Sequence, residues 1–458
     1  MSSATQGTDV AVIGAGIVGI AVAHALATRQ GVARLVLLDP AEPMGLTSAQ
    51  SGENYRNWWP HPVMRAFTDD AITLLEQFAR DSGNRLRMTR RGYALATRRA
   101  APEDLFAALA RGYGEGADAR IRLHDGAGAT YRPAASADWE AAPDGVDVLM
   151  GAALVRAHFP SYAADVETVL HIRRAGDISG QQMGAWMLER IRAAGGRVLR
   201  ARVRGIGGGA PFALDLEGPE GRATLRADRI VNAAGPFLGD VAAMLGEELP
   251  VQNVFQQKIA FEDRAGAIPR AMPFSIDLDG QHIPWTEDER AELAADPAAR
   301  HLTLPMPGGI HCRPEGGDGG SWVKLGWAYN RAPSYPRAEA PPMVPHFPDI
   351  VLRAAGRLNP ALDAYVGRLP RGARHYGGHY TMTPENWPLI GPMRTPGAFM
   401  AGALSGYGTM AATATGALCA AWIADAPRPA HADLFTLARY DDPALIAALR
   451  ADETKGVL

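Results

Sequence analysis

The feature that most constrains the fold is a glycine-rich turn that directly follows an apolar run near the N-terminus. Residues 10–19 read Val-Ala-Val-Ile-Gly-Ala-Gly-Ile-Val-Gly, the pattern of a buried strand that runs into a G-x-G-x-x-G loop. In this motif Gly14 makes the tight turn, Gly16 lets the backbone approach a pyrophosphate, and Gly19 lets the next helix pack on the strand. The pattern predicts a βαβ unit that binds an adenine dinucleotide at a helix N-terminus, where free N–H groups and the helix dipole favour phosphate.

An acidic residue at the required distance strengthens this prediction. The apolar run over residues 34–39 ends in Asp39, about 20 residues after the last glycine of the motif. A carboxylate at this place accepts hydrogen bonds from a ribose diol and rejects a 2′-phosphate, which excludes NADP. The alternative is an ordinary glycine-rich turn. It is less favoured because the strand, the helix predicted over residues 17–30 and the acid occur in the required order.

Length and composition limit the classes of protein to consider. With 458 residues the chain is long for one core, so two domains or one domain with a large insertion are expected. The net charge is −3 and the charges are interspersed, so neither a nucleic acid nor a membrane partner is indicated. Cys312 and Cys419 are the only cysteines, which excludes a disulfide framework and any C-x-x-C pair. The histidines show no ligand spacing, so no metal is expected.

The sequence predicts a soluble protein of the cytoplasm. The segment Met1–Asp9 is polar and has no basic region ahead of an apolar core, so no signal peptide is expected. No stretch is apolar for long enough to span a bilayer. The low cysteine content fits a reducing compartment.

The order of patterns along the chain predicts a nucleotide-binding domain that is discontinuous in sequence. Apolar residues recur at helical spacing or in buried runs in several segments. The segments expected to be helices are 62–80, 183–194 and 409–424, and those expected to be strands are 92–97, 195–203 and 227–235. The predicted division assigns residues 1–84, 166–248 and 370–458 to the nucleotide domain. Residues 85–165 and 249–369 would form a substrate domain threaded through it.

Six segments spread over nearly the whole chain carry a family resemblance. They are the glycine motif with Asp39, residues 45–56, Gly176-Asp-Ile-Ser179, Val231–Gly235, Tyr380–Glu385 and Ser405-Gly-Tyr-Gly408. Together they resemble the FAD-dependent amine and amino-acid oxidase family, which includes D-amino acid oxidase, glycine oxidase and monomeric sarcosine oxidase. The resemblance implies an α/β fold of two domains. A Rossmann-like FAD-binding domain would be combined with a discontinuous substrate domain built on a large antiparallel sheet.

FAD is a long ligand, so a protein that binds it extended needs polar contacts well beyond the first βαβ unit. Residues 47–54 supply hydroxyl and amide groups where ribityl and pyrophosphate oxygens should lie, unless they form a plain solvated loop. The helix after Gly406-Tyr-Gly408 would place its positive N-terminus at the flavin pyrimidine, unless the loop only starts a helix. The residues expected to bind FAD are Gly14, Gly16, Ile17, Val18, Gly19, Asp39, Ser48, Gln50, Ser51, Asn54, Val203, Ala234, Gly235, Gly406, Tyr407, Gly408 and Thr409.

Position 378 bears on how the cofactor is attached. In the sarcosine oxidases a cysteine two residues before the matching tyrosine is bonded to the flavin, and this chain has Gly378 there. Without a thiol that attachment cannot form, so non-covalent FAD is expected. A linkage to a histidine elsewhere is left open.

Two residues are implied to be catalytic by the resemblance. Residues 320–327 resemble the sarcosine-oxidase strand whose lysine places an ammonium beside the flavin for the reaction with oxygen. This implies that role for Lys324, and the alternative is a surface lysine on a strand. Tyr380 matches an active-site tyrosine of the family, and the alternative is a buried core tyrosine.

The chain also departs from the family pattern at the substrate site. The carboxylate-binding lysine of the family falls on Met410, and the histidine after the Lys-Leu-Gly strand falls on Ala328. The clamp for small amino acids is therefore incomplete, which makes sarcosine or glycine a poor prediction. Arg56 or Arg374 could hold a carboxylate instead, and His379 is a further candidate for substrate binding.

The function implied by the resemblance is oxidation of an amine or an N-substituted amino acid. Hydride would pass from the α-carbon to the flavin, the imine would hydrolyse, and oxygen would reoxidise the flavin to give hydrogen peroxide. One alternative is a dehydrogenase that passes electrons to a quinone or carrier, and another is a flavin-bound assembly or binding protein without turnover. The adjacent Trp58 and Trp59 suggest a larger or aromatic substrate, although a pair of core tryptophans is equally favoured.

Overall fold

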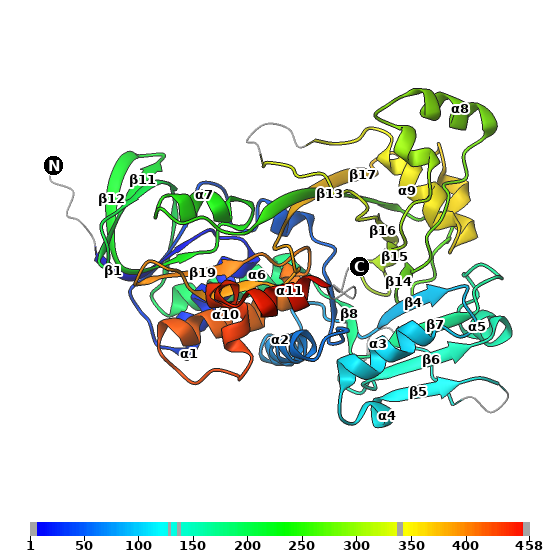
Figure 1. Ribbon diagram of the computed structural model, residues 1–458, viewed down its shortest axis with the longest axis horizontal. Helices are drawn as coiled ribbons and strands as arrows, with labels where there is room; N and C mark the ends of the chain where they lie inside the picture. The colour runs from blue at the N-terminus through cyan, green and yellow to red at the C-terminus, as the bar shows by residue number, and fades with distance from the viewer. Residues whose placement is uncertain (1–6, 127–129, 135–138, 337–341, 452–458) are drawn as a thin grey trace.

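The computed structural model describes residues 7–126, 130–134, 139–336 and 342–451. Most of the N-terminal segment on which the signal-peptide prediction rests, residues 1–6, lies outside this range. The described chain forms two large sheets side by side, each with its own helices (Figure 1). No helix within these ranges combines the length and the apolar character needed to cross a bilayer.

The first sheet contains the predicted βαβ unit. Its strand order is β10-β11-β12-β1-β2-β9, and β19 joins β12 with β18 beyond it. The strands are β1 (Gly7–Ile13), β2 (Leu35–Asp39), β9 (Arg197–Arg200), β10 (Arg202–Gly207), β11 (Phe212–Gly218), β12 (Gly221–Asn232), β18 (Leu389–Pro392) and β19 (Ala398–Gly402). Strands β19, β12, β1, β2 and β9 are parallel, so their carboxyl ends meet at one edge. The strand predicted over 195–203 is divided at Ala201, because β10 leaves the parallel set to pair antiparallel with β11.

Helices cover the first sheet and hold its parallel strands. The predicted helices are confirmed as α1 (Ile17–Arg29), α2 (Pro62–Asp81), α6 (Gly180–Ala193) and α10 (Gly408–Ile423), and α7 (Leu238–Ala243) is an additional short helix. Helices α1 and α10 approach so closely that a Cβ added at Gly416 would lie 2.4 Å from the carbonyl carbon of Ala21. Both helices begin at the carboxyl edge of the sheet, so their contact also fixes that edge.

The second sheet has the strand order β17-β13-β16-β15-β14-β4-β7-β6-β5. Most neighbouring strands are antiparallel, as expected, but the pairs β4–β14 and β5–β6 are parallel. The strands are β4 (Tyr93–Thr97), β5 (Ile121–His124), β6 (Val146–Met150), β7 (Thr168–Ile172), β13 (Gln252–Glu262), β14 (Phe274–Asp277), β15 (Ile310–Glu315), β16 (Trp322–Gly326) and β17 (Arg374–Met382). A small separate sheet pairs β3 (Asn54–Arg56) with β8 (Ala175–Asp177).

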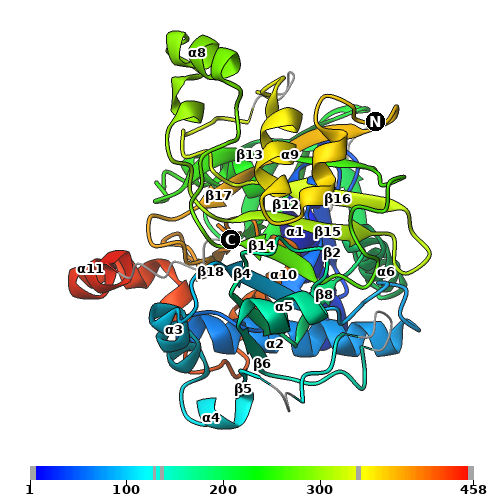
Figure 2. The ribbon, with the colours of Figure 1, turned by 90° about the vertical axis from the view of Figure 1, so that its right-hand side faces the viewer.

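Side chains alternate between the two faces of this second sheet. On one face Ile259, Phe261 and Leu325 pack with α9 (Phe347–Gly356), which covers the sheet in Figure 2. Lys258 alternates to the opposite face, where it lines a cavity together with residues of the first sheet. The remaining helices are α3 (Glu103–Tyr113), α4 (Ala117–Arg120), α5 (Ala152–His158), α8 (Glu287–Ala295) and α11 (Pro443–Ala451).

The two sheets do not follow the predicted division of the chain at every point. Strands β7 and β17 belong to the second sheet, whereas the prediction groups their residues with the nucleotide domain. Strand pairing brings β7 next to β4 and β17 next to β13, and neither contact is local in sequence. The division into two domains itself stays a prediction.

The contact between α1 and α10 gives the first testable expectation. Gly416→Ala should lower the free energy of unfolding by about 1–3 kcal/mol, because the added methyl group overlaps the backbone of α1 at Ala21. This loss should appear although alanine favours a helix by up to about 1 kcal/mol over glycine. Chemical denaturation measures it. The control is Gly209→Ala, where a Cβ meets nothing within 4 Å. A Gly416→Ala protein at least as stable as wild type would contradict this account.

Candidate active site

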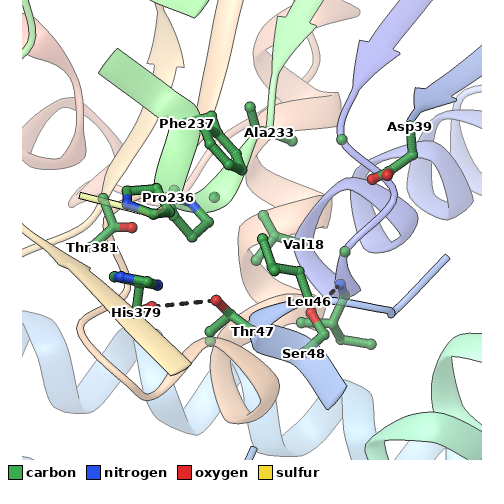
Figure 3. A pocket seen from close by; sticks show the side chains of 18 of the residues that line it. Val18, Asp39, Leu46, Thr47, Ser48, Ala233, Pro236, Phe237, His379 and Thr381 are labelled. Carbon is green, nitrogen blue, oxygen red and sulfur yellow. Dashed lines mark hydrogen bonds between the residues drawn. The ribbon is translucent and has the colours of Figure 1, made fainter. Parts of the chain in front are cut away.

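A long cavity of about 870 Å³ opens at the carboxyl edge of the first sheet. It is lined by residues that directly follow parallel strands, among them Gly14 after β1, Asp39 at the end of β2 and Ala233 after β12. In open parallel sheets this edge is where ligands bind. The cavity continues to β17, where His379 and Thr381 form its far wall (Figure 3).

The glycine turn at one end of the cavity is too crowded for side chains. A Cβ at Gly14 would lie 2.3 Å from the carbonyl oxygen of Ala233, and one at Gly19 would lie 1.9 Å from the carbonyl oxygen of Gly14. The turn and the first residues of α1 therefore pack directly against the loop after β12. In the first turn of α1 the N–H of Ile17 donates to Ser48 and that of Ile20 donates to the carbonyl of Gly16, whereas the N–H groups of Val18 and Gly19 have no acceptor within the helix and can face an anion.

The carboxylate of Asp39 is held against this turn. One oxygen accepts a hydrogen bond from the backbone N–H of Ala15 at 2.8 Å, and the other accepts one from Ala41 at 2.9 Å. A carboxylate has further lone pairs, so it can bind a ribose hydroxyl as well. Asp39 therefore shapes the turn in addition to facing the cavity.

The middle of the cavity is bounded by the short 3₁₀ segment Thr47–Gln50. The hydroxyl of Ser48 accepts a hydrogen bond from the backbone N–H of Ile17 at 2.9 Å, which joins this segment to the start of α1. Pro236 and Phe237 face it across the cavity (Figure 3). The cavity therefore runs from Asp39 past this segment to β17.

Most residues expected to bind FAD line this cavity. Fourteen of them do: Gly14, Gly16, Ile17, Val18, Asp39, Ser48, Gln50, Ser51, Val203, Ala234, Gly235, Gly406, Gly408 and Thr409. Gly19 lies beneath the turn, and Asn54 and Tyr407 line a second cavity instead. The contacts of these residues with FAD stay a prediction.

The second cavity has a volume of about 110 Å³ and adjoins the first. The residues that line both cavities are Ser51, Gly52, Lys258, Tyr380, Ser405, Gly406 and Thr409. Its other walls come from β3, from the second sheet and from the start of α10. A ligand in this small cavity would touch one end of a ligand in the long cavity.

Arg56 is a buried cation of the second cavity. It is 2% exposed, and its guanidinium carbon lies 5.2 Å from the ring centre of Trp59, 5.9 Å from that of Trp58 and 5.7 Å from that of Tyr93. Aromatic faces attract a cation at such distances. Burial lowers the pKa of Arg56 to about 10, which still leaves it charged at neutral pH. The adjacent tryptophans thus surround this arginine.

Lys258 is a site residue that the sequence reasoning missed. Its Nζ donates a hydrogen bond to the hydroxyl of Tyr380 at 3.0 Å and lies 5.1 Å from the centre of that ring. The lysine is 5% exposed and lines both cavities. One signal was present in the sequence: Lys258 interrupts the otherwise uncharged run 252–261, which reads as a buried strand.

Lys324, in contrast, lines neither cavity. Its Nζ lies 2.7 Å from a carboxylate oxygen of Glu53 and 3.0 Å from one of Glu315. Arg313 beside it donates to the carbonyl oxygen of Gly52 at 2.9 Å and pairs with the same Glu315 at 2.7 Å. This ionic cluster anchors the loop at Gly52 and Glu53, which borders both cavities, to the second sheet.

The other expected substrate residues are separated from Arg56. His379 lines the long cavity, with its Nε2 3.2 Å from the hydroxyl of Ser334, and burial lowers its pKa. Arg374 is exposed at the start of β17 and lines neither cavity. Tyr380 stands between the two cavities. In the described part of the chain, no three or more His, Cys, Asp or Glu side chains are grouped so as to hold a metal ion.

Comparisons with known proteins place this geometry in a family. A model of FAD dependent oxidoreductases matches residues 9–422 of the chain. A search of the curated proteins gives no match. Among solved structures, L-proline dehydrogenase from P. horikoshii has a TM-score of 0.70 at 16% identity, with 96% of this chain and 99% of the other covered. Glycine oxidase from Geobacillus kaustophilus has a TM-score of 0.69 at 16% identity, over 95% and 99% of the two chains. NikD, an amino acid oxidase of nikkomycin biosynthesis, has a TM-score of 0.67 at 17% identity, over 94% and 98%.

The residues around the two cavities fit FAD. Gly16 lines the long cavity, and a Cβ added there would meet only the hydroxyl of Ser48, at 3.2 Å, so this glycine leaves the wall open to a pyrophosphate. Around the second cavity, the hydroxyl of Ser405 and the side-chain oxygens of Gln256 and Asn54 are buried and have no hydrogen-bond partner among the described residues. Buried polar atoms are normally paired, so these atoms are suited to a polar ligand such as the flavin or a substrate.

Asp39→Ala tests the nucleotide end of the site. The substitution should weaken FAD binding by roughly 1–3 kcal/mol, because it removes a charged acceptor and also leaves the N–H of Ala15 without its partner. FAD titration of apoprotein, followed by flavin fluorescence, measures the Kd. The exposed Asp215→Ala serves as control. An unchanged Kd would show that Asp39 neither binds the ribose nor shapes the turn.

Proposed function

The chain belongs to the FAD dependent oxidoreductase family, and from this premise we propose that it oxidises a small amino acid at the carbon next to nitrogen, with oxygen as the electron acceptor. The observation that carries the proposal is the small cavity with a buried arginine that adjoins the dinucleotide cavity. When bound, FAD supplies the hydride acceptor. We further propose that it is held without a covalent bond, since Gly378 offers no thiol to the cavity that it lines.

Arg56 is suited to hold the anionic end of such a substrate. Its guanidinium is fixed among aromatic rings and can bind a carboxylate with two parallel hydrogen bonds. The aromatic walls also exclude water, which strengthens the ionic contact. A carboxylate held there would leave the amine end of the substrate toward the junction with the long cavity, where FAD is expected.

The volume of the second cavity favours a small substrate. An engineered protein cavity of about 150 Å³ holds benzene, whereas this one has about 110 Å³. The larger or aromatic substrate suggested by Trp58 and Trp59 would need the walls to move. The printed names of three structural neighbours, L-proline dehydrogenase, glycine oxidase and an amino acid oxidase, agree with an amino-acid substrate.

Lys258 is better placed than Lys324 to assist the reaction with oxygen. Oxygen gains negative charge when it takes up the first electron, and a fixed ammonium beside the flavin lowers that barrier. Lys258 lines both cavities, whereas Lys324 is held by Glu53 and Glu315 outside them. We therefore assign to Lys258 the function that the resemblance implies for Lys324.

Arg56→Lys should impair substrate binding, because a planar fork becomes a point charge that cannot make the paired hydrogen bonds. The Kd for L-proline or glycine, whichever reduces the wild-type flavin in anaerobic stopped-flow mixing, should rise at least about 10-fold, the effect of losing one hydrogen bond to a charged group. Arg374→Lys is the control, since Arg374 is exposed and outside both cavities. Equal effects of the two substitutions would remove Arg56 from the site. A wild-type flavin that no amino acid bleaches would favour the binding protein without turnover.

Lys258→Met and Lys324→Met form a matched pair for the oxygen reaction. The protein is first reduced with dithionite, so that the substrate site is not involved, and is then mixed with oxygenated buffer. Lys258→Met should slow reoxidation by about 100-fold or more, the scale of losing one preorganised electrostatic group, whereas Lys324→Met should change it little. The reverse order would restore the assignment to Lys324. Slow reoxidation of the wild type itself would favour the dehydrogenase, the activity that the L-proline dehydrogenase neighbour is named for.

A further inference from the structure

His311 is a polar group of the second cavity that the family resemblance does not assign. It lies on β15 opposite Gly326 of β16, and Gly326 in turn lies opposite Lys258 of β13. His311 and Lys258 thus share the face of the second sheet that meets the cavity, and both line it. The ring packs on Phe274, with 5.0 Å between ring centres.

The strand between these two residues leaves room for the imidazole. A Cβ added at Gly326 would lie 2.5 Å from Nε2 of His311 and 3.1 Å from Cγ of Lys258. Ala328, just after β16, also lines the cavity, where the family resemblance expects a histidine. The small residues of one strand therefore allow an imidazole to enter the cavity from the next strand.

The hydrogen bonds of the ring determine which nitrogen faces the ligand. Nδ1 lies 3.1 Å from the carbonyl oxygen of Gly309, and since a carbonyl only accepts, the proton is assigned to Nδ1. The lone pair of the neutral ring is then on Nε2. Within the described residues, Nε2 makes no hydrogen bond.

The surroundings keep this imidazole uncharged. Burial, together with the positive charges of Lys258 from β13 and Arg313 from its own strand, lowers the pKa of His311 to about 4. Phe274 of β14 and Tyr93 of β4, which also line the cavity, bring no charge, since burial raises the pKa of the tyrosine. At neutral pH His311 is therefore a hydrogen-bond acceptor.

The charges of the cavity decide what such an acceptor can bind. The anion of an amino acid is attracted to the cation Arg56, whereas a lone pair repels it. An ammonium group would meet the positive charges of Lys258, Arg56 and Arg331, which lower its pKa and favour the neutral amine. The carboxylate of Glu53, which also lines the cavity, is already paired with Lys324 at 2.7 Å. A neutral amine still has N–H groups to donate, and its own lone pair stays available to expel hydride.

We propose that Nε2 of His311 accepts a hydrogen bond from the amine N–H of the bound substrate while Arg56 holds its anionic end. This inference rests on the proposed function and adds a selectivity to it. Primary and secondary amines, which keep an N–H when neutral, are preferred over tertiary amines, which leave Nε2 buried without a partner.

The test compares substrates that differ only in methylation of the nitrogen. The probes are glycine, sarcosine and N,N-dimethylglycine, together with L-proline and N-methyl-L-proline. Anaerobic stopped-flow mixing of the FAD-loaded protein measures flavin reduction at several substrate concentrations, which separates the reduction rate from the Kd. Wild type should reduce its flavin about 10-fold more efficiently with the N–H member of a pair than with its tertiary partner, the effect of one buried hydrogen bond.

Three substitutions of His311 then show whether the acceptor causes this selectivity. His311→Phe and His311→Leu remove the acceptor and should lower the efficiency of flavin reduction by N–H substrates about 10-fold, with little change for tertiary amines. The ratio of the efficiency with an N–H substrate to that with its tertiary partner should then approach one. His311→Gln keeps an acceptor near Nε2 and should retain the ratio. The control is His375→Phe, since His375 lies on β17 of the same sheet, stacks on Phe347 and lines neither cavity.

The outcomes separate this inference from the proposed function. A wild type that does not distinguish secondary from tertiary amines overturns the inference, and this result does not depend on whether any variant folds. A ratio that stays unchanged in His311→Phe and His311→Leu also overturns it and leaves the proposed function intact. Absence of flavin reduction by every probe contradicts the proposed function itself, and the inference falls with it.

Discussion

The site depends on backbone contacts that leave no room for side chains at the start of α1. The turn at Gly14 lies directly on the carbonyl group of Ala233, and α1 is pressed from its other side by α10 at Gly416. These contacts join three segments that are distant in the sequence: the first strand, the loop after β12 and the last long helix. Because protein interiors are close-packed, fixing α1 in this way also fixes the end of the long cavity that lies at the glycine turn.

The second sheet completes the site through an ionic contact with the loop after Asp39. Lys324 and Arg313 hold Glu53, Glu315 and the carbonyl group of Gly52 in one partly buried cluster. Such clusters contribute little net stability, since burying charges costs about as much as pairing them returns, but they fix geometry. Here the cluster holds the loop that borders both cavities, so the second cavity keeps its position relative to the long cavity.

The charges around the second cavity suit an amino acid whose carboxylate is charged and whose nitrogen is neutral. Arg56 and Lys258 are cations at the small cavity, and the neutral His311 adds a hydrogen-bond acceptor without further charge. These cations favour a carboxylate and disfavour the ammonium form of an amine, while the carboxylate of Glu53, which also lines the cavity, is paired with Lys324. Under the proposed function, this arrangement would hold the carboxylate of an amino acid and keep its nitrogen neutral, so that the α-carbon can give up hydride.

The sequence by itself determined the parts that rest on local spacing. The strand, glycine turn and helix of the dinucleotide motif, the acid at Asp39 and each separate segment of the family resemblance depend on residues close together in the chain, because a turn and a helix start are set by their own residues. The long amphipathic and small-residue helices were predictable for the same reason.

Only the tertiary structure decided which side chains reach the second cavity. Strand β16 pairs with β13 on one side and with β15 on the other, and this pairing brings Lys258 and His311 to the cavity. Lys324, on β16, is instead held by Glu53 and Glu315. A side chain two residues along a strand keeps the same face but lies about 7 Å away, so no spacing within one strand could show which lysine lines the cavities.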